Sequence, residues 1–456
     1  MGSSAKDDNA PDIRNGRLSA TELEKNFGDL HAPLSRSEAL IEADRCYFCY
    51  DAPCTIACPT DIDIPGFIQQ IRSDNVKGSA YTILKENIMG GMCARVCPTE
   101  VLCEQDCVRN THEDQPVRIG MLQRFATDGI VEHNTQLFER QPDSGRRVAV
   151  VGAGPAGLSC AHRLATLGHR VVVYNRDPKP AGLNEYGIAA YKTVDDFAQR
   201  EVEYILSIGG IEIQNGKALG RDVTLEQLRK EYDAVFVGVG LGDVNQLGLE
   251  KEDLDGALNA VDYIAELRQA SDKGKLPVGR RVVVIGGGMT AIDIAVQSRR
   301  LGAEEVHMVY RRGPEQMGAS VYEQELAMTN GVQIHHWAMP VALHGDQHVS
   351  AVEFERTSLD GQDALRGSGK RFVLQADVVF KAVGQQASED LFGDLAASLQ
   401  TQRGKLQIDE ERRTTLDGVW AGGDCVYGHD DLTVTAVQDG KLAAISIDRA
   451  LRAAGA

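Results

Sequence analysis

The sequence has no apolar run long enough to cross a membrane. A membrane-spanning helix needs about 18 consecutive apolar residues, and no stretch of this 456-residue chain approaches that length. The polar start, MGSSAKDDNAPDIRNG, lacks the apolar core of a secretion signal and the Ser or Thr that N-myristoylation requires at the sixth position. We therefore expect a cytoplasmic protein that does not enter a membrane.

Basic residues are outnumbered in this chain. There are 66 Asp and Glu residues against 48 Lys and Arg residues, which gives a formal net charge of -18. Such a charge repels nucleic acid and anionic membrane surfaces, so neither is an expected partner. A hydrophobic fraction of 43% and a charged fraction of 25% are ordinary for a globular protein. The length exceeds what one core usually serves, so we expect two or three domains.

Cysteines are almost absent outside one short segment. Eight of the ten lie between Cys46 and Cys107, and only Cys160 and Cys425 fall elsewhere. Neither of these two has a partner in a CxxC or CxxxxC motif, which argues against a dithiol reductase. In a large cytosolic chain, crowded thiols indicate metal ligation, because the reducing cytosol does not maintain disulfides.

The spacing of the crowded cysteines favours iron-sulfur clusters over zinc. Zinc sites usually have two CxxC pairs, and a second pair is missing here. Seven well-spaced thiols suit two clusters, and a Cys-Pro step after a run of cysteines is typical of ferredoxins. The eighth ligand must be Cys93 or a residue other than cysteine. The seven are Cys46, Cys49, Cys54, Cys58, Cys97, Cys103 and Cys107.

Two segments have the pattern of a dinucleotide-binding fold. A buried strand over 148–151 leads through a glycine turn into a helix over 158–167, and the pattern returns with a strand over 282–285 and a helix over 291–301. The glycines let the backbone approach a pyrophosphate at the positive helix N-terminus. The candidate contacts are Gly152, Gly154, Pro155, Ala156 and Gly157 in the first turn, and Gly286, Gly288, Met289 and Thr290 in the second.

The strand that follows each glycine helix ends without the usual acidic residue. After 170–174 the chain has Asn175, which can hydrogen-bond a ribose without the strength that a carboxylate charge adds. After 306–310 it has Arg311 and Arg312, which can hold a 2'-phosphate that an acid would repel. The sequence thus favours NADPH over NADH, unless the two arginines are solvated surface charges.

The C-terminal part of the chain indicates that the first dinucleotide site binds FAD. The stretch GVWAGGD, which ends in Gly423 and Asp424, resembles the second FAD motif of two-dinucleotide flavoproteins, in which the Asp holds the ribityl chain. The alternative is an Asp in an ordinary turn. The segment 433–441 then reads as the helix whose N-terminus, at Thr433, is directed at the flavin ring in such proteins.

These patterns predict an α/β protein: a helical N-terminal iron-sulfur domain, followed by two nested Rossmann-like domains. The segments 64–73 and 80–87 have the apolar spacing of helices. If the C-terminal motif completes the first dinucleotide fold, the second fold is inserted into it. The expected domains are an iron-sulfur domain over 1–140, an FAD domain over 141–262 and 384–456, and an NAD(P)H domain over 263–383.

Four stretches carry a family resemblance that covers nearly the whole chain. RCYFCYDAPCTIACPT, IDIPGFI, MCARVCPTEVLCEQDC and IGMLQRFATD resemble the N-terminal module of dihydropyrimidine dehydrogenases, and the similarity extends through both dinucleotide folds. The resemblance implies two 4Fe-4S clusters. It assigns Cys46, Cys49, Cys54 and Cys107 to the first cluster, and Cys58, Cys97, Cys103 and Gln123 to the second.

Gln123 separates two related families. The small subunit of glutamate synthase resembles this chain in architecture but has a glutamate in the corresponding stretch, so the glutamine favours the pyrimidine enzyme. Cys93 is then a small buried residue. The loop over 181–192 lacks the proline and arginine that the family often has, and we retain Gly182 and Lys192 as candidate flavin contacts.

The chain has no room for a pyrimidine site of its own. The family reduces its base at an FMN in a separate barrel, which needs about 250 residues. The resemblance therefore implies the stand-alone flavoprotein subunit of a bacterial dihydropyrimidine dehydrogenase. Such a subunit would oxidise NAD(P)H at FAD and pass single electrons to a partner FMN subunit that reduces uracil or thymine. The alternatives are a glutamate synthase small subunit, a stand-alone NAD(P)H diaphorase with structural zinc, and a nucleotide-sensing module.

Overall fold

The computed structural model describes residues 12–361 and 363–454, which form two compact units. Unit 1 consists of the described residues up to Asp29, together with Tyr186–Tyr191 and Val244–Gln385. Unit 2 consists of Leu30–Glu185, Lys192–Asp243 and the described residues from Gln386 onward. None of the described helices is both long and apolar enough to span a membrane.

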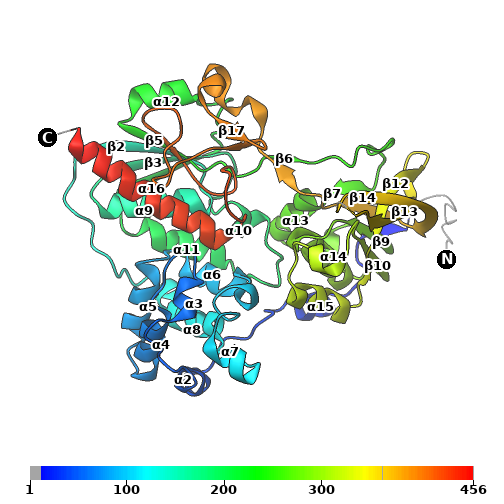
Figure 1. Cartoon of the computed structure of the whole chain (residues 1–456), viewed down its shortest axis with the longest axis horizontal. Helices are drawn as coiled ribbons and strands as arrows, with labels where there is room; N and C mark the ends of the chain where they lie inside the picture. The colour runs from blue at the N-terminus through cyan, green and yellow to red at the C-terminus, as the bar shows by residue number, and fades with distance from the viewer. Residues whose placement is uncertain (1–11, 362, 455–456) are drawn as a thin grey trace, which may run out of the picture. The chain divides into compact units, whose positions relative to one another are not determined.

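The first part of unit 2 is a helical module (blue to cyan in Figure 1). Its helices are α2 (Arg36–Asp44), α3 (Pro53–Ile56), α4 (Ile64–Arg72), α5 (Val76–Leu84), α6 (Gly90–Val96), α7 (Val108–Glu113) and α8 (Ile119–Glu132). Helix α2 begins with a capping box between Ser35 and Glu38. Apolar residues on α4 at helical spacing, such as Phe67 and Ile71, are buried in a core that also includes Leu122 of α8.

The rest of unit 2 is built on a parallel sheet of order β19-β5-β2-β3-β4. Its strands are β2 (Arg147–Val151), β3 (Arg170–Asn175), β4 (Ile211–Asn215), β5 (Ala234–Val237) and β19 (Val419–Ala421). Helices α9 (Pro155–Thr166) and α16 (Thr433–Ala453) cover one face, and α12 (Leu225–Glu231) lies on the other. Since β19 pairs with β5, C-terminal residues complete the sheet that begins at β2. Helices α10 (Leu183–Tyr186) and α11 (Phe197–Leu206) follow β3.

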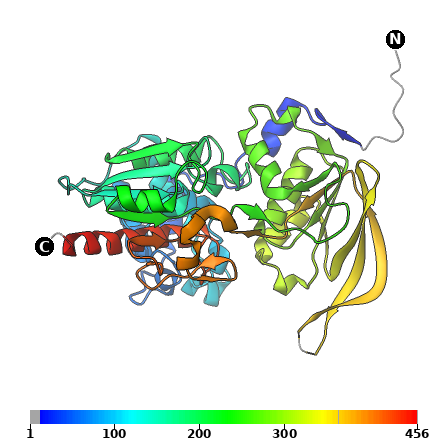
Figure 2. The ribbon, with the colours of Figure 1, turned by 90° about the horizontal axis from the view of Figure 1, so that it is seen from above.

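Unit 1 contains a second parallel sheet, of order β11-β10-β9-β15-β7. Its strands are β7 (Ala257–Asn259), β9 (Arg281–Ile285), β10 (Glu305–Val309), β11 (Gln333–His335) and β15 (Val378–Lys381), with helices α13 (Ala260–Gln269), α14 (Met289–Arg300) and α15 (Val321–Thr329). A three-stranded antiparallel sheet of β12 (Ala338–Gly345), β13 (Val349–Leu359) and β14 (Leu365–Gln375) accompanies it (yellow in Figure 2). The expected fold class, a helical domain followed by two Rossmann-like folds, is confirmed.

The N-terminal segment groups differently from the expected domain over 1–140. Strand β1 (Ile13–Arg14) pairs with β8 (Val278–Gly279), and the Asn26 side chain at the end of α1 (Ala20–Asn26) donates to the Arg300 carbonyl at 2.9 Å. Residues 12–29 thus belong to unit 1. Local spacing could not show this, because both contacts join residues more than 250 positions apart.

A short segment inside the expected FAD domain also groups differently from the prediction. Residues 186–191 belong to unit 1, where the backbone N–H of Ala189 donates to Asp293 at 3.1 Å and that of Ala190 to Gln297 at 3.0 Å. The main segment of unit 1 runs from residue 244 to residue 385, whereas the sequence predicted an NAD(P)H domain over 263–383.

Candidate cofactor and iron-sulfur sites

The first glycine turn leaves one position open to a ligand. Gly152 has a φ of +101°, and a Cβ there would lie 2.1 Å from the Gly238 carbonyl oxygen. A Cβ on Gly157 would lie 1.9 Å from the Gly152 carbonyl oxygen, so both positions require glycine. At Gly154, by contrast, the nearest atom would be 4.0 Å away, just where Pro155 begins α9. This turn fits a pyrophosphate at the helix N-terminus.

The loop that contains Gly182 lies against the same turn. Gly182 has a φ of +54°, and a Cβ there would lie 2.9 Å from the Cα of Gly154. The structure therefore brings Gly182 to the predicted flavin turn. Lys192 is half-buried at the point where the chain returns to unit 2, and its contact with flavin stays a prediction.

Asn175 is buried at the end of β3, and its amide nitrogen is already engaged. It donates to the carbonyls of Asp177 at 2.9 Å and Lys179 at 3.0 Å, and to Oδ1 of Asn215 at 2.8 Å. These bonds hold the loop that follows the strand. A ribose hydroxyl would have to donate to the side-chain carbonyl oxygen, so the ribose contact stays a prediction.

The C-terminal motif packs on the first glycine helix. A Cβ on Gly423 would lie 3.1 Å from the Cβ of Ala156, so the turn before Asp424 is fixed against α9. Burial, followed by the nearby charge of Asp431, raises the pKa of Asp424 to about 6. The structure thus brings together the two segments from which the sequence predicted an FAD site.

Asp439, which the sequence analysis overlooked, holds this turn in place. Its side chain is 1% exposed; Oδ2 accepts from the Gly423 N–H at 2.8 Å and from His429 at 2.7 Å, and Oδ1 accepts from Arg412 at 2.7 Å. A signal was available, because Asp439 interrupts an otherwise apolar stripe that includes Ala436 and Ala443 on α16.

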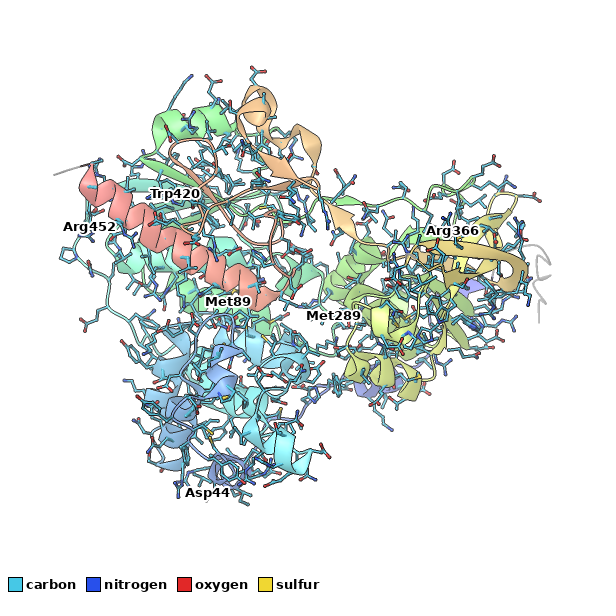
Figure 3. The ribbon with its side chains drawn as sticks, viewed as in Figure 1. Asp44, Met89, Met289, Arg366, Trp420 and Arg452 are labelled. Carbon is cyan, nitrogen blue, oxygen red and sulfur yellow. The ribbon has the colours of Figure 1, made fainter. Side chains whose placement is uncertain are left out.

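Asn184 links the start of α16 to the helical module. The Thr433 hydroxyl donates to Oδ1 of Asn184 at 3.0 Å, and the Asn184 amide lies 3.9 Å from the sulfur of Met89. Met89, labelled in Figure 3, is the N-cap of α6, and Cys97 is the C-cap of the same helix. Since α6 is about 10 Å long at 1.5 Å per residue, one short helix joins the predicted flavin site to a predicted cluster ligand.

The second glycine turn, in unit 1, repeats the geometry of the first. A Cβ on Gly286 would lie 2.2 Å from the Ala382 carbonyl oxygen, whereas one on Gly288 would meet no atom within 4 Å. Helix α14 begins at Met289, with Thr290 in its first turn. This turn also fits a pyrophosphate, here that of a nicotinamide coenzyme.

Arg311 and Arg312 follow β10 with their guanidinium groups unpaired. Neither guanidinium group forms a hydrogen bond or ion pair with any residue that the structure describes; Arg311 is exposed and Arg312 is half-buried. Trp337, which the sequence analysis overlooked, lies beside them. Its backbone N–H donates to the Arg312 carbonyl at 3.1 Å, and its φ of +57° is rare for a residue with a bulky side chain. Both arginines are therefore available to an anionic ligand.

Four cysteines line one cavity in the helical module. They are Cys46, Cys49, Cys54 and Cys107, the set that the resemblance assigned to the first cluster. Burial, with the nearby Cys107 and Cys46, raises the pKa of Cys54 to about 12. Buried thiolates at this spacing repel one another and need a cationic partner, which the iron of a cluster supplies. The donor set fits a cluster.

The structure groups Cys58, Cys97 and Cys103 of the second set. Two residues, Gln123 and Cys93, are candidates for the fourth ligand. A hydrogen bond with Cys93, then burial, then the nearby Cys103 and Cys58 raise the pKa of Cys97 well above its usual value. Gln123 is buried on α8, where its amide donates to the Gly90 carbonyl at 2.7 Å.

The structure thus places Cys93 directly beside Cys97, and the choice between Cys93 and Gln123 stays a prediction. Within residues 12–361 and 363–454, no three His, Cys, Asp or Glu side chains form a site for a single metal ion. The assignment of clusters therefore rests on the cysteine spacing, on the cavity around the first set and on family membership.

Comparison with protein families matches most of the chain. Residues 146–440 match the pyridine nucleotide-disulphide oxidoreductase family. Residues 23–135 match the family described as dihydropyrimidine dehydrogenase domain II, 4Fe-4S cluster.

Named relatives cover nearly the full chain. The NAD-dependent dihydropyrimidine dehydrogenase subunit PreT of Escherichia coli (strain K12) is 36% identical over 417 residues, which are 91% of this chain and 95% of the relative. The glutamate synthase [NADPH] small chain of the same organism is 34% identical over 443 residues, with 92% of this chain and 93% of the relative covered.

Solved structures share the fold at lower identity. FprA of Mycobacterium tuberculosis in complex with NADPH is 20% identical, with a TM-score of 0.56 over 69% of this chain and 86% of that one. The thioredoxin reductase of T. acidophilum is 19% identical, with a TM-score of 0.52 over 67% and 99%. These two support the paired dinucleotide-binding folds and nothing finer.

Proposed function

Because this chain belongs to the pyridine nucleotide-disulphide oxidoreductase family and carries the 4Fe-4S domain of dihydropyrimidine dehydrogenases, we propose that it is the electron-input subunit of a two-subunit dihydropyrimidine dehydrogenase. As a family member it is an NAD(P)H-dependent oxidoreductase that binds FAD and a 4Fe-4S cofactor. In the proposed complex, NAD(P)H is oxidised here, and a partner FMN subunit reduces uracil or thymine to the dihydropyrimidine. Bound FAD would accept a hydride and release its electrons singly, and each cluster would carry one.

The main support for the proposal is the similarity to PreT, a dihydropyrimidine dehydrogenase subunit, over 91% of this chain and 95% of PreT. The arrangement within unit 2 supports it. Helix α6 runs from Met89, beside Asn184, to Cys97, and the two cysteine sets adjoin, since Cys54 of the first lies near Cys103 of the second. Electrons that enter at the flavin site thus have a short path through both sets.

The chain's own residues would bind and orient the two nucleotides. The open positions at Gly154 and Gly288 admit the pyrophosphates, and Asp439 fixes the turn that presents Asp424. The unpaired Arg311 and Arg312 support NADPH as the coenzyme. The two relatives differ in coenzyme: PreT belongs to an NAD-dependent enzyme and the glutamate synthase small chain to an NADPH enzyme.

Reconstitution with the partner tests the proposal. We expect the purified chain, mixed with an FMN-containing dihydropyrimidine dehydrogenase subunit, to oxidise NADPH only when uracil or thymine is present. A Cys107→Ser variant should lose this activity but still reduce a quinone that takes electrons directly from flavin. Uracil-independent glutamate formation with a glutamate synthase large subunit, from glutamine and 2-oxoglutarate, would instead contradict the proposal.

The second candidate is the glutamate synthase small subunit, which the 34% identity over 92% of the chain supports. The same reconstitution separates the two candidates, because each partner has its own substrate.

We place the protein in the cytoplasm, since all ten cysteines are free thiols and cluster ligands need a reducing compartment.

A further inference from the structure

Unit 2 contains a pocket that none of the candidate cofactor or cysteine residues lines. It lies where the chain leaves α5, between that segment and helices α9 and α16. Its charged lining residues are Lys85, Glu86, Arg163 and Lys441, and its walls include Phe138 and the imidazole of His162.

His162 has a buried nitrogen without a partner. The residue is 5% exposed, and its Nε2 is enclosed with no hydrogen bond to a described residue. The ring of Phe138 meets the imidazole edge-on at 5.3 Å, so it blocks one side and cannot satisfy the nitrogen. A buried polar atom of this kind is normally satisfied by water or a ligand. Burial lowers the pKa of His162 to about 3, so the imidazole is neutral near pH 7.

The one carboxylate in the pocket wall, that of Glu86, is already paired with lysines. Glu86 accepts from Lys441 at 3.0 Å through Oε2, and its Oε1 lies 3.9 Å from the Lys85 ammonium. Lys441 also donates to the Thr60 carbonyl at 2.9 Å, and Arg163 donates to the Lys85 carbonyl. A ligand would therefore meet donors, chiefly the remaining N–H groups of Arg163 and of Lys85.

The net charge of the pocket lining also favours an anionic ligand. Three cations, Lys85, Arg163 and Lys441, line the pocket against one carboxylate, Glu86. Burial lowers the pKa of Arg163, and the nearby Glu86 and Tyr81 act against this shift only in part. A bound anion would supply the missing charge and the missing acceptors together.

We propose that this pocket binds a small oxyanion, a phosphate or a short carboxylate, between Arg163 and Lys85 with His162 at its base. The occupant would touch the segment after α5 in the helical module, and α9 and α16 of the flavin fold. It therefore ties the cysteine-bearing helices to the fold that holds FAD. Binding of the anion stabilises that arrangement by mass action.

Calorimetric titration of the FAD- and iron-loaded protein tests the site. The probes are inorganic phosphate and acetate at constant ionic strength, with chloride as the reference and NADP⁺ at saturation so that Arg311 and Arg312 are occupied. We expect saturable binding by the wild type and at least tenfold weaker binding by Arg163→Gln. The matched control is Arg170→Gln, because Arg170 is an exposed arginine paired with Asp143 and should bind as the wild type does.

Lys85→Gln provides a second variant on a different element, and flavin and iron content show whether each variant is folded. Selenate soaked into crystals grown without phosphate should give an anomalous peak beside Arg163. Binding of phosphate alone, of acetate alone or of both supports the proposal and identifies the anion. No saturable binding, or wild-type affinity in both Arg163→Gln and Lys85→Gln, overturns it, and the pocket then holds water.

Discussion

Arg311 and Arg312 are the side chains that decide the coenzyme. They follow strand β10 of the NAD(P)H fold, where an acid would select NADH, and their guanidinium groups have no partner among the described residues. A guanidinium group that is not paired with a carboxylate of the same protein can bind a phosphate through two hydrogen bonds.

Replacement of both arginines by Ala should therefore weaken the use of NADPH far more than that of NADH. We expect kcat/KM for NADPH to fall about 100-fold, from the loss of charge-assisted hydrogen bonds worth about 1.5–3 kcal/mol each. The value for NADH should change less than about threefold, within roughly 0.7 kcal/mol. Equal losses with the two coenzymes would show that the pair does not contact the 2'-phosphate.

Gln123 and Cys93 compete for one place at the second cluster. Gln123 has the support of the family resemblance, whereas Cys93 lies one helical turn before Cys97 on α6. An amide is a poor iron ligand compared with a thiolate, but it removes negative charge from a cluster and so changes its potential.

We expect Gln123→Cys to keep the iron content and shift the potential of one cluster, and Cys93→Ser to leave both unchanged. Iron analysis and redox titration followed by electron paramagnetic resonance measure the two quantities. Loss of about four irons per chain in Cys93→Ser, one 4Fe-4S cluster's worth, together with none lost in Gln123→Ala, would assign the ligand to Cys93.

Helices α6 and α11 meet at a buried carboxyl group. Glu201 of α11 is fully buried; its Oε1 accepts from the Met92 N–H on α6 at 2.9 Å, while Oε2 has no partner among the described residues. Burial raises the pKa of Glu201 to about 8, against which Arg95 and the Met92 hydrogen bond act only in part. The carboxyl group is therefore protonated in the folded protein near pH 7.

This element-level contact predicts a pH dependence of stability. The folded protein keeps the Glu201 proton up to about pH 8, whereas the unfolded chain loses it above about pH 4.5. Stability should fall as the pH rises between these values, by about 1.4 kcal/mol per pH unit from this group. In urea unfolding, Glu201→Gln should lose that slope relative to the wild type; an unchanged slope would contradict a protonated Glu201.

At the scale of the whole molecule, the chain divides into a unit that would bind the coenzyme and a unit that would hold flavin and clusters. The second unit contains β19 and α16 from the C-terminal part of the chain, so the NAD(P)H fold is an insertion between two segments of the flavin fold. The cysteines all belong to this unit.

The full complement of cofactors should follow from this organisation. We expect purified protein to contain one FAD and about eight irons per chain, as two 4Fe-4S clusters require. Iron, acid-labile sulfide and flavin analysis measure these values, with zinc measured on the same sample. Stoichiometric zinc with little iron would support the structural-zinc alternative.

The sequence by itself determined the elements and the cofactor class. The apolar strands before Gly152 and Gly286 and the glycine turns are local patterns, and each encodes its geometry within about twenty residues. The cysteine spacing indicated the cofactor class over a longer stretch, from Cys46 to Cys107. The Rossmann-like folds could therefore be read before any contact was known. Gly154 and Gly288 were predicted from the same local patterns, because only their backbone positions matter.

Tertiary structure decided the contacts between distant segments. The grouping of residues 12–29 with the NAD(P)H fold, the role of Asp439 behind Asp424, and the hydrogen bond from Gln123 to the Gly90 carbonyl all depend on packing. The physical reason is that hydrogen bonding and burial are set by whichever residues meet in space. A pattern along the chain shows which groups need partners, and only the folded chain shows which partners they find.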